Sequence, residues 1–144
     1  MAIFGVGSNW EGDELKQNFF EKELFTVGWS ISEGEDLYNA VSSLKVGDII
    51  YIKANSPGSR NLRVKGIGIV TDSLFQTLII QNKEVNKIKD YSGLSINVKW
   101  LVQKEFQIKI PVNAGRLTNV RAATYYEEFL PFVQKEIIKN LCHK

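Results

Sequence analysis

Apolar residues are concentrated in one stretch in the first half of the chain, residues 46–71. Residues 49–52 are apolar at four consecutive positions, which indicates a strand that is covered on both faces. Residues 55–59, Asn-Ser-Pro-Gly-Ser, supply the residue types that turns require. The pattern therefore predicts a first strand and a turn, followed by a second strand.

That second strand, residues 62–70, is rich in Val and Ile but contains two glycines. Gly66 and Gly68 lie inside it, where a missing side chain usually marks a bend or a close approach by another element. We therefore expect a strongly curved hairpin that forms part of a small β-barrel.

Further elements are expected on both sides of this hairpin. Extended segments are predicted at residues 2–6, 26–31, 74–81, 94–101 and 106–110 from their apolar runs and alternation. Helices are predicted at residues 13–25, 32–44 and 122–141, the last interrupted or restarted at Pro131. Residues 82–93 read as a basic surface connection. The prediction is one α+β domain over residues 1–144, with about six strands, two early helices and a helical end.

Composition is that of an ordinary globular protein, with 44% hydrophobic and 24% charged residues. No apolar run approaches the roughly 20 residues that span a bilayer, and residues 1–7 lack the order of a secretory signal. A single cysteine, Cys142, is compatible with a reducing compartment. We expect a cytoplasmic protein with no membrane segment.

Charge is distributed unevenly along the chain. Residues 1–48 hold nine acidic and three basic side chains, whereas residues 49–144 hold seven acidic and fifteen basic ones. This asymmetry favours a positive face that meets phosphates, although solvated loops of uneven charge would give the same counts. The candidate phosphate-binding residues are Lys53, Arg60, Arg63, Lys65, Arg116 and Arg121.

Residues for catalysis are few. The single histidine, His143, follows Cys142 one residue before the end of the sequence, where fraying is expected, and no spacing resembles a zinc or calcium signature. Residues 5–7, Gly-Val-Gly, resemble part of a dinucleotide loop, but Trp10 stands where the fingerprint needs glycine. We therefore expect a protein that is not an enzyme and that uses neither a metal nor a cofactor.

Two tryptophans lie in polar turns, which makes them the better functional lead. Trp10 follows Ser8 closely, and Trp29 directly precedes Ser30. An isolated tryptophan is most often a core anchor, but two that converge at one barrel rim could stack on a nucleobase. Serine and asparagine side chains beside them would then read the edge of that base.

The order of the motifs resembles the EVE and YTH branch of the PUA-like superfamily. The resemblance covers most of the chain and rests on V-G-S-N-W, V-G-W-S, V-G-D-I-I-Y-I-K and V-K-G-I-G-I-V, in that order. Further on, I-N-V-K-W resembles the strand that follows the pocket in YTH domains, and L-T-N-V-R resembles their later Thr-Asn-x-Arg segment.

This resemblance implies a β-pseudobarrel with flanking helices and an aromatic pocket for a modified base. Trp29 matches the first cage aromatic by motif position, and Ser8 with Asn9 matches the polar segment that touches the base. The later cage tryptophan of YTH domains has no equivalent here, so either Tyr91 takes its place or the cage is smaller. Bacterial domains of this kind often belong to restriction or antiviral systems, in which a separate effector acts after recognition.

The leading hypothesis is a noncatalytic module that flips a modified base, expected to be in DNA, into an aromatic pocket. The candidate pocket residues are Ser8, Asn9, Trp10, Trp29, Ser30 and Tyr91. The alternative is a binder or sensor of a free nucleotide or another small aromatic metabolite. Strand binding should depend steeply on salt, whereas binding of a free nucleoside should not.

Overall fold

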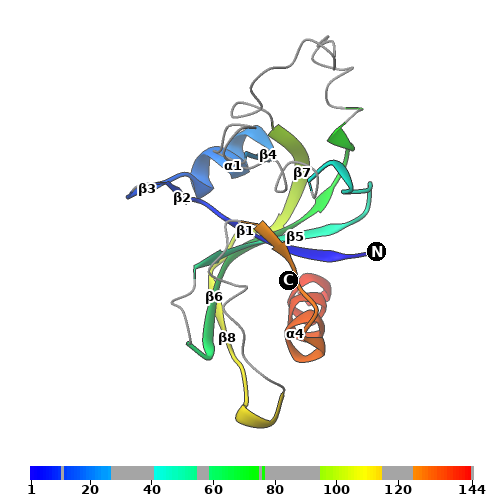
Figure 1. Cartoon of the computed structure of the whole chain (residues 1–144). Coiled ribbons are helices and arrows are strands. Elements are labelled where there is room, and N and C mark those ends of the chain that lie inside the picture. The colour runs from blue at the N-terminus through cyan, green and yellow to red at the C-terminus, as the bar shows by residue number, and fades with distance from the viewer. Residues whose placement is uncertain are drawn as a thin grey trace.

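The structure is a computed structural model that describes residues 1–10, 12–26, 41–54, 59–74, 76, 95–114 and 125–143. The strands are β1 (Ile3–Gly7), β2 (Asn9–Trp10), β3 (Asp13–Glu14), β4 (Leu24–Thr26), β5 (Ile49–Ala54), β6 (Asn61–Val70), β7 (Ser95–Val102), β8 (Phe106–Lys109) and β9 (Tyr125–Glu127). The helices described over their whole length are α1 (Lys16–Lys22) and α4 (Pro131–Cys142), and a 3₁₀ turn, η2, covers Val112–Ala114 (Figure 1). Among the described residues, no helix is long and apolar enough to cross a bilayer.

Seven of these strands form one curled sheet in the order β4-β7-β6-β5-β1-β9, while β8 pairs with the first part of β6. β1 and β5 are parallel, and the other pairs in the sheet are antiparallel. The two outer strands, β4 and β9, contact each other through side chains. The ring centres of Phe25 on β4 and Tyr125 on β9 lie 6.5 Å apart, and the angle between the ring planes is 12°. This mixed α+β, barrel-like sheet agrees with the coarse fold predicted from the sequence.

The central strand β5 is buried on both faces, which confirms the prediction from its continuous apolar run. Ile50 belongs to a core cluster that contains Phe19 of α1. The next residue, Tyr51, belongs to a second cluster that contains Ile137 of α4. Successive side chains of a strand point to opposite faces, so α1 and α4 cover opposite sides of the sheet (Figure 1).

The two glycines of β6 mark close approaches, as predicted. A Cβ atom at Gly66 would lie 2.8 Å from the Phe20 ring. A Cβ atom at Gly68 would lie 2.4 Å from Val98 Cγ1 and 2.7 Å from the Lys99 carbonyl oxygen. The pairing of β6 with β7 also shifts register at Gly68, so these glycines allow the hairpin to bend tightly against α1 and β7.

Introducing a side chain at Gly68 should therefore destabilise the fold. We expect Gly68→Val to lower the free energy of unfolding by about 3 kcal/mol, because valine suits a strand but overpacks this one. Urea denaturation measures the change. The control is Gly12→Ala, where nothing lies within 4 Å and only a positive φ of 92° opposes the new side chain. Equal urea midpoints for Gly68→Val and the wild type would contradict the steric interpretation.

The predicted helix from residue 122 is wrong in its first part. Residues Tyr125–Glu127 form β9, which pairs antiparallel with β1. The helix begins only at Pro131, so the proline lies in the first turn of α4. Tyr125 packs into the cluster on the α1 side, and Tyr126 packs into the cluster on the α4 side. Burial of both rings on opposite faces therefore outweighs the helical spacing seen in the sequence.

Two other predicted elements differ from the structure. Leu74 and Gln76 are helical, so no strand begins at residue 74; residues 77–81 lie outside the description. The Gln76 N–H donates to Ser73 Oγ at 3.2 Å and the Ser73 N–H donates to Gln76 Oε1 at 2.7 Å, which is a capping box. The helix predicted at residues 13–25 is shorter, because β3 precedes it and Glu23, with φ of 52°, ends it in a left-handed conformation.

Candidate functional site

The end of β1 lies at the rim of the sheet, where the chain turns into a short ribbon. Ser8 follows β1 and is fully buried. The ribbon of β2 and β3 pairs Asn9 with Glu14, and the Leu15 N–H then donates to the Ser8 carbonyl at 2.8 Å. The chain thus folds back on itself within seven residues, and Glu14 returns to the side of Ser8.

A buried ion pair fills the space beside Ser8. Lys65, only 3% exposed, places its Nζ 2.5 Å from Glu14 Oε2 and 3.3 Å from Ser8 Oγ. The Ser8 hydroxyl donates to the other Glu14 oxygen. Burial alone would raise the pKa of the Glu14 carboxyl, but hydrogen bonds from Lys65, Ser8 and the Lys16 backbone hold that pKa below its usual value.

A β-bulge explains why Lys65 points into this cluster. The pairing of β5 with β6 passes from Ile52 and Gly66 to Lys53 and Val64, so β6 carries one extra residue, Lys65. Such a bulge leaves one residue outside the regular ladder and redirects its side chain. A lysine inside an otherwise apolar strand can therefore reach Glu14.

Lys53 lies next to this ion pair and is buried without a carboxylate of its own. Lys53 as a whole residue is 9% exposed, and its Nζ lies 5.8 Å from the centre of the Tyr126 ring. Burial lowers the pKa of Lys53 to about 8, and the charge of Lys65 contributes to the shift. No described residue accepts a hydrogen bond from this ammonium or pairs with it as an anion.

A second buried network fixes the Tyr126 ring under Lys53. The Tyr51 and Tyr126 hydroxyl oxygens lie 2.6 Å apart, and the Tyr51 hydroxyl donates to Glu128 Oε1 at 2.8 Å. Glu128 Oε2 also accepts the Leu130 N–H at 3.1 Å, just before α4. Burial raises the Tyr51 pKa well above its usual value, so its hydroxyl stays protonated and can donate. A Cβ atom at Gly5 would lie 2.4 Å from the Tyr126 ring, so only glycine at this position leaves room for the ring.

The candidate phosphate-binding residues divide into two groups. Lys53 and Lys65 are buried residues near Ser8. Arg63 lies in the first part of β6 and is exposed, and Arg60 directly precedes this strand. Arg63 pairs with Glu105, and an Arg60 guanidinium nitrogen donates to the Pro111 carbonyl at 3.0 Å. Arg116 and Arg121 lie outside the described residues. The sequence therefore identified basic residues of this region without revealing that two of them are buried.

The candidate pocket residues are described only in part. Asn9 is exposed, and its Oδ1 accepts the Gly12 N–H at 3.0 Å. Trp10 pairs through its backbone with Asp13. Trp29, Ser30 and Tyr91 fall outside the described residues, so their convergence stays a prediction.

The neighbouring described residues show where these segments join the sheet. Thr26 and Ser95 face each other at the end of the β4 and β7 ladder, with their hydroxyl oxygens 2.9 Å apart. Trp29 follows Thr26 by three positions, and Tyr91 precedes Ser95 by four. Both segments are therefore attached to the same end of one strand pair.

Glu14 and Tyr126 are the site residues that the sequence interpretation missed. Glu14 falls in the helix that the sequence predicts at residues 13–25, and Tyr126 falls in the one predicted at residues 122–141. The available signal was a lysine enclosed by apolar residues in a strand, which needs a buried partner. Which acidic residue supplies that partner depends on the return of the ribbon, which the sequence pattern did not indicate.

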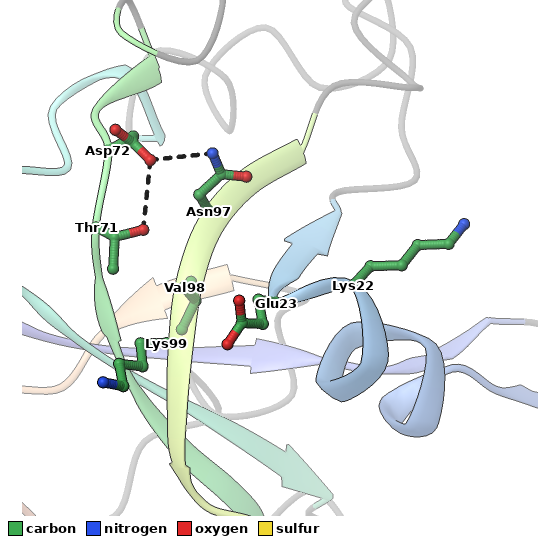
Figure 2. A pocket seen from close by; sticks show the side chains of 7 residues that line it. All are labelled: Lys22, Glu23, Thr71, Asp72, Asn97, Val98 and Lys99. Atoms are coloured by element: carbon green, nitrogen blue, oxygen red, sulfur yellow. Dashed lines mark hydrogen bonds between the residues drawn. The ribbon is translucent and has the colours of Figure 1, made fainter. Parts of the chain in front are cut away.

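A separate cavity of about 470 Å³ lies near the end of α1 and is lined by Lys22, Glu23, Thr71, Asp72, Asn97, Val98 and Lys99. Figure 2 shows Asp72 and Asn97 facing each other, while Lys22 points away from them. Asn97 Nδ2 donates to Asp72 Oδ2 at 3.0 Å, which joins β7 to the residues after β6. This mixed-charge cavity contains none of the residues predicted for the pocket.

No protein-family model matches the chain, and no curated protein sequence matches it. Among the described residues, no group of three or more His, Cys, Asp or Glu side chains could hold a metal ion. The buried polar groups at the end of β1 are therefore the features from which a function is inferred.

Proposed function

We propose that this domain is a PUA-like module of the EVE and YTH type that binds a modified base in nucleic acid, with DNA as the expected polymer. The pocket is at the rim where β1 ends, and the domain recognises its ligand without catalysis. In this proposal Ser8, Asn9 and Trp10 form one side of the pocket, and Trp29 supplies the stacking ring.

The observation that carries the proposal is the Lys53 ammonium, which no described anion neutralises although the residue is only 9% exposed. A buried charge without a partner is unfavourable, so its presence favours a ligand that brings negative or carbonyl oxygen atoms. Nucleic acid offers both, as phosphate oxygens and as the exocyclic oxygens of bases. Lys65 differs, because Glu14 already neutralises it.

The closure of the sheet brings the strands that precede the two predicted sides of the pocket close together, although β4 and β1 run in opposite directions. Phe25 of β4 contacts the ring of Tyr125 on β9, and β9 pairs with β1. The strand that precedes Trp29 therefore packs against the neighbour of the strand that precedes Ser8. A base stacked in a duplex cannot enter such a rim without leaving its partner, so the target base should be flipped.

A panel of oligonucleotides that differ in a single modified base tests this function. One modified oligonucleotide should bind more tightly than its unmodified counterpart, and a mismatch opposite the modified base should tighten binding further. Lys53→Gln should weaken binding, whereas Lys99→Gln, which removes an exposed lysine from β7, should not. Equal affinity for all members of the panel would contradict base recognition.

The stacking role of Trp29 has its own test. Trp29→Ala should weaken binding of the preferred oligonucleotide by about 5- to 150-fold, since loss of one stacking ring corresponds to about 1–3 kcal/mol. Fluorescence anisotropy measures the affinity, and circular dichroism checks the fold. A folded Trp29→Ala variant with unchanged affinity would remove Trp29 from the pocket.

A free nucleotide is the second candidate ligand, and the outer arginines favour it. Arg63 pairs with Glu105, which also lies 3.7 Å from Lys16, so part of the outer positive charge is neutralised within the protein. A long phosphate track needs cations that are available to the backbone. Strand binding should change steeply with salt and weaken in Arg60→Gln and Arg63→Gln, whereas nucleotide binding should change little.

A further inference from the structure

Lys53 combines three features that are uncommon for a lysine. It is nine-tenths buried at the end of β5, its ammonium lies over the Tyr126 ring, and no described anion pairs with it. The register shift between Ile52 and Lys53 places it beside the bulged Lys65. The structure thus holds an amine at the rim of the sheet and gives it a cation instead of a carboxylate as its neighbour.

These surroundings activate an amine as a nucleophile. A lysine becomes nucleophilic when burial or a neighbouring cation favours its neutral form, and both act on Lys53. With a pKa of about 8, roughly a quarter of the Lys53 side chains would be neutral at pH 7.5. The groups that face it are Lys65 on β6 and Tyr126 on β9, and the charge of Lys65 is balanced by Glu14 on β3.

We propose that Lys53 forms a reversible imine with an aldehyde carried by the ligand of this pocket. This inference rests on the proposed function and narrows its ligand to nucleic acid that bears an aldehyde. Two sources present that group: a formylated base, and the open-ring sugar of an abasic site. Both offer an electrophilic carbon to an amine that is fixed at the rim.

The reaction needs no oxidant or reductant. The neutral Lys53 nitrogen attacks the carbonyl carbon and forms a C–N bond, while the nitrogen loses a proton and the oxygen gains one. The resulting hydroxyl group is then protonated and leaves as water, and the nitrogen lone pair forms the C=N bond of an iminium ion. Loss of the remaining N–H proton gives the imine and returns the proton that was supplied. The Lys65 ammonium, held by Glu14 and Ser8, is a proton donor within the same cluster. One water molecule is released for each imine formed, and its return reverses the reaction.

Trapping with cyanoborohydride tests the inference on the full chain. The protein is incubated with three oligonucleotides of one sequence, which carry a formylated pyrimidine, an abasic site or the unmodified base. We expect a covalent adduct, detected by intact mass, with at least one of the two aldehyde oligonucleotides and none with the unmodified one. Peptide mapping should place the adduct on Lys53, at least tenfold above any other lysine. Comparison of the two aldehydes identifies the source.

Two variants separate the site from general lysine reactivity. Lys53→Arg keeps the charge but cannot form an imine, so its adduct should be lost, while Lys99→Arg should react like the wild type. Adducts spread over surface lysines, or retained in Lys53→Arg, would overturn the inference. Mapping on the wild-type protein gives the same decision if Lys53→Arg does not fold.

Binding without reductant distinguishes the two levels of the proposal. An aldehyde oligonucleotide that binds by anisotropy but gives no trapped adduct would overturn the imine, and base recognition would stand. Absence of binding to every oligonucleotide, together with absence of any adduct, would overturn the proposed function and the imine with it. A specific adduct on Lys53 supports both.

Discussion

Replacing Lys53 with methionine should make the folded protein more stable at pH 7, by about 1 kcal/mol. Burial lowers the pKa of Lys53 from 10.5 to about 8, so the folded state disfavours the charged form. At about 1.4 kcal/mol for each pKa unit the full penalty would be roughly 3 kcal/mol, and solvent screening of the ammonium reduces it to about 2 kcal/mol. Loss of the contact between the ammonium and the Tyr126 ring offsets about 1 kcal/mol of the gain.

The sign of the pH dependence follows from the same two pKa values. Below pH 8 both states carry the proton, so the penalty of the wild type is fully present. Between pH 8 and 10.5 the folded state loses the proton before the unfolded state does, so wild-type stability rises with pH. The advantage of Lys53→Met should therefore shrink across this window. Urea denaturation of both proteins at pH 7 and pH 10 measures it.

The Lys53→Met variant should also bind the preferred oligonucleotide more weakly. This loss of binding would explain why a lysine that lowers stability is present at this position. Groups that lower stability are commonly kept where activity needs them. Lys99→Met is the matched control, because Lys99 is an exposed lysine on β7. A stabilised Lys53→Met variant with full binding would assign Lys53 no part in recognition, and a destabilised one would contradict its unneutralised charge.

The sequence was sufficient for the elements in which local pattern and packing agree. The continuous apolar run of β5 predicts a strand that is buried on both faces, and Ile50 and Tyr51 pack on opposite faces of the sheet. Pro131 predicts a helix start and lies in the first turn of α4. In each case one local rule is reinforced by the tertiary structure.

Elements that depend on contacts between residues far apart in the sequence could not be predicted from local sequence pattern. Tyr125 and Tyr126 fit a helix in the sequence, but both rings are buried only when β9 pairs with β1. The bulge at Lys65 depends on how β5 meets β6, and neither strand shows it alone. Ser73 and Gln76 are a different case, since their capping-box spacing is visible in the sequence and argues against the strand predicted at residues 74–81.

Breaking the buried ion pair from its two sides should give unequal losses of stability. Lys65 is almost fully buried, whereas the Glu14 side chain is 36% exposed. Glu14→Gln leaves a buried ammonium without a counter-charge, which corresponds to about 3–5 kcal/mol for a fully buried pair and to about 2–3 kcal/mol at this partly exposed site. Lys65→Met removes the buried charge itself and leaves a carboxylate that water can reach, so we expect a loss of about 1 kcal/mol or less.

Acid should remove the difference between the wild type and Glu14→Gln. The pKa of Glu14 is lowered in the folded state, so its contribution is present above its usual pKa of 4.5 and is lost as the pH falls through the folded-state pKa. The two proteins should differ by the full amount at pH 7 and converge only as the pH falls through the lowered folded-state pKa of Glu14. Lys16→Gln is the control, since it removes an outer lysine that lies 3.7 Å from Glu105 and should change stability by less than about 0.5 kcal/mol. Equal losses in Glu14→Gln and Lys65→Met would mean that Lys65 reaches water when Glu14 no longer holds it, and the rim of the sheet would then be more open than the buried cluster requires.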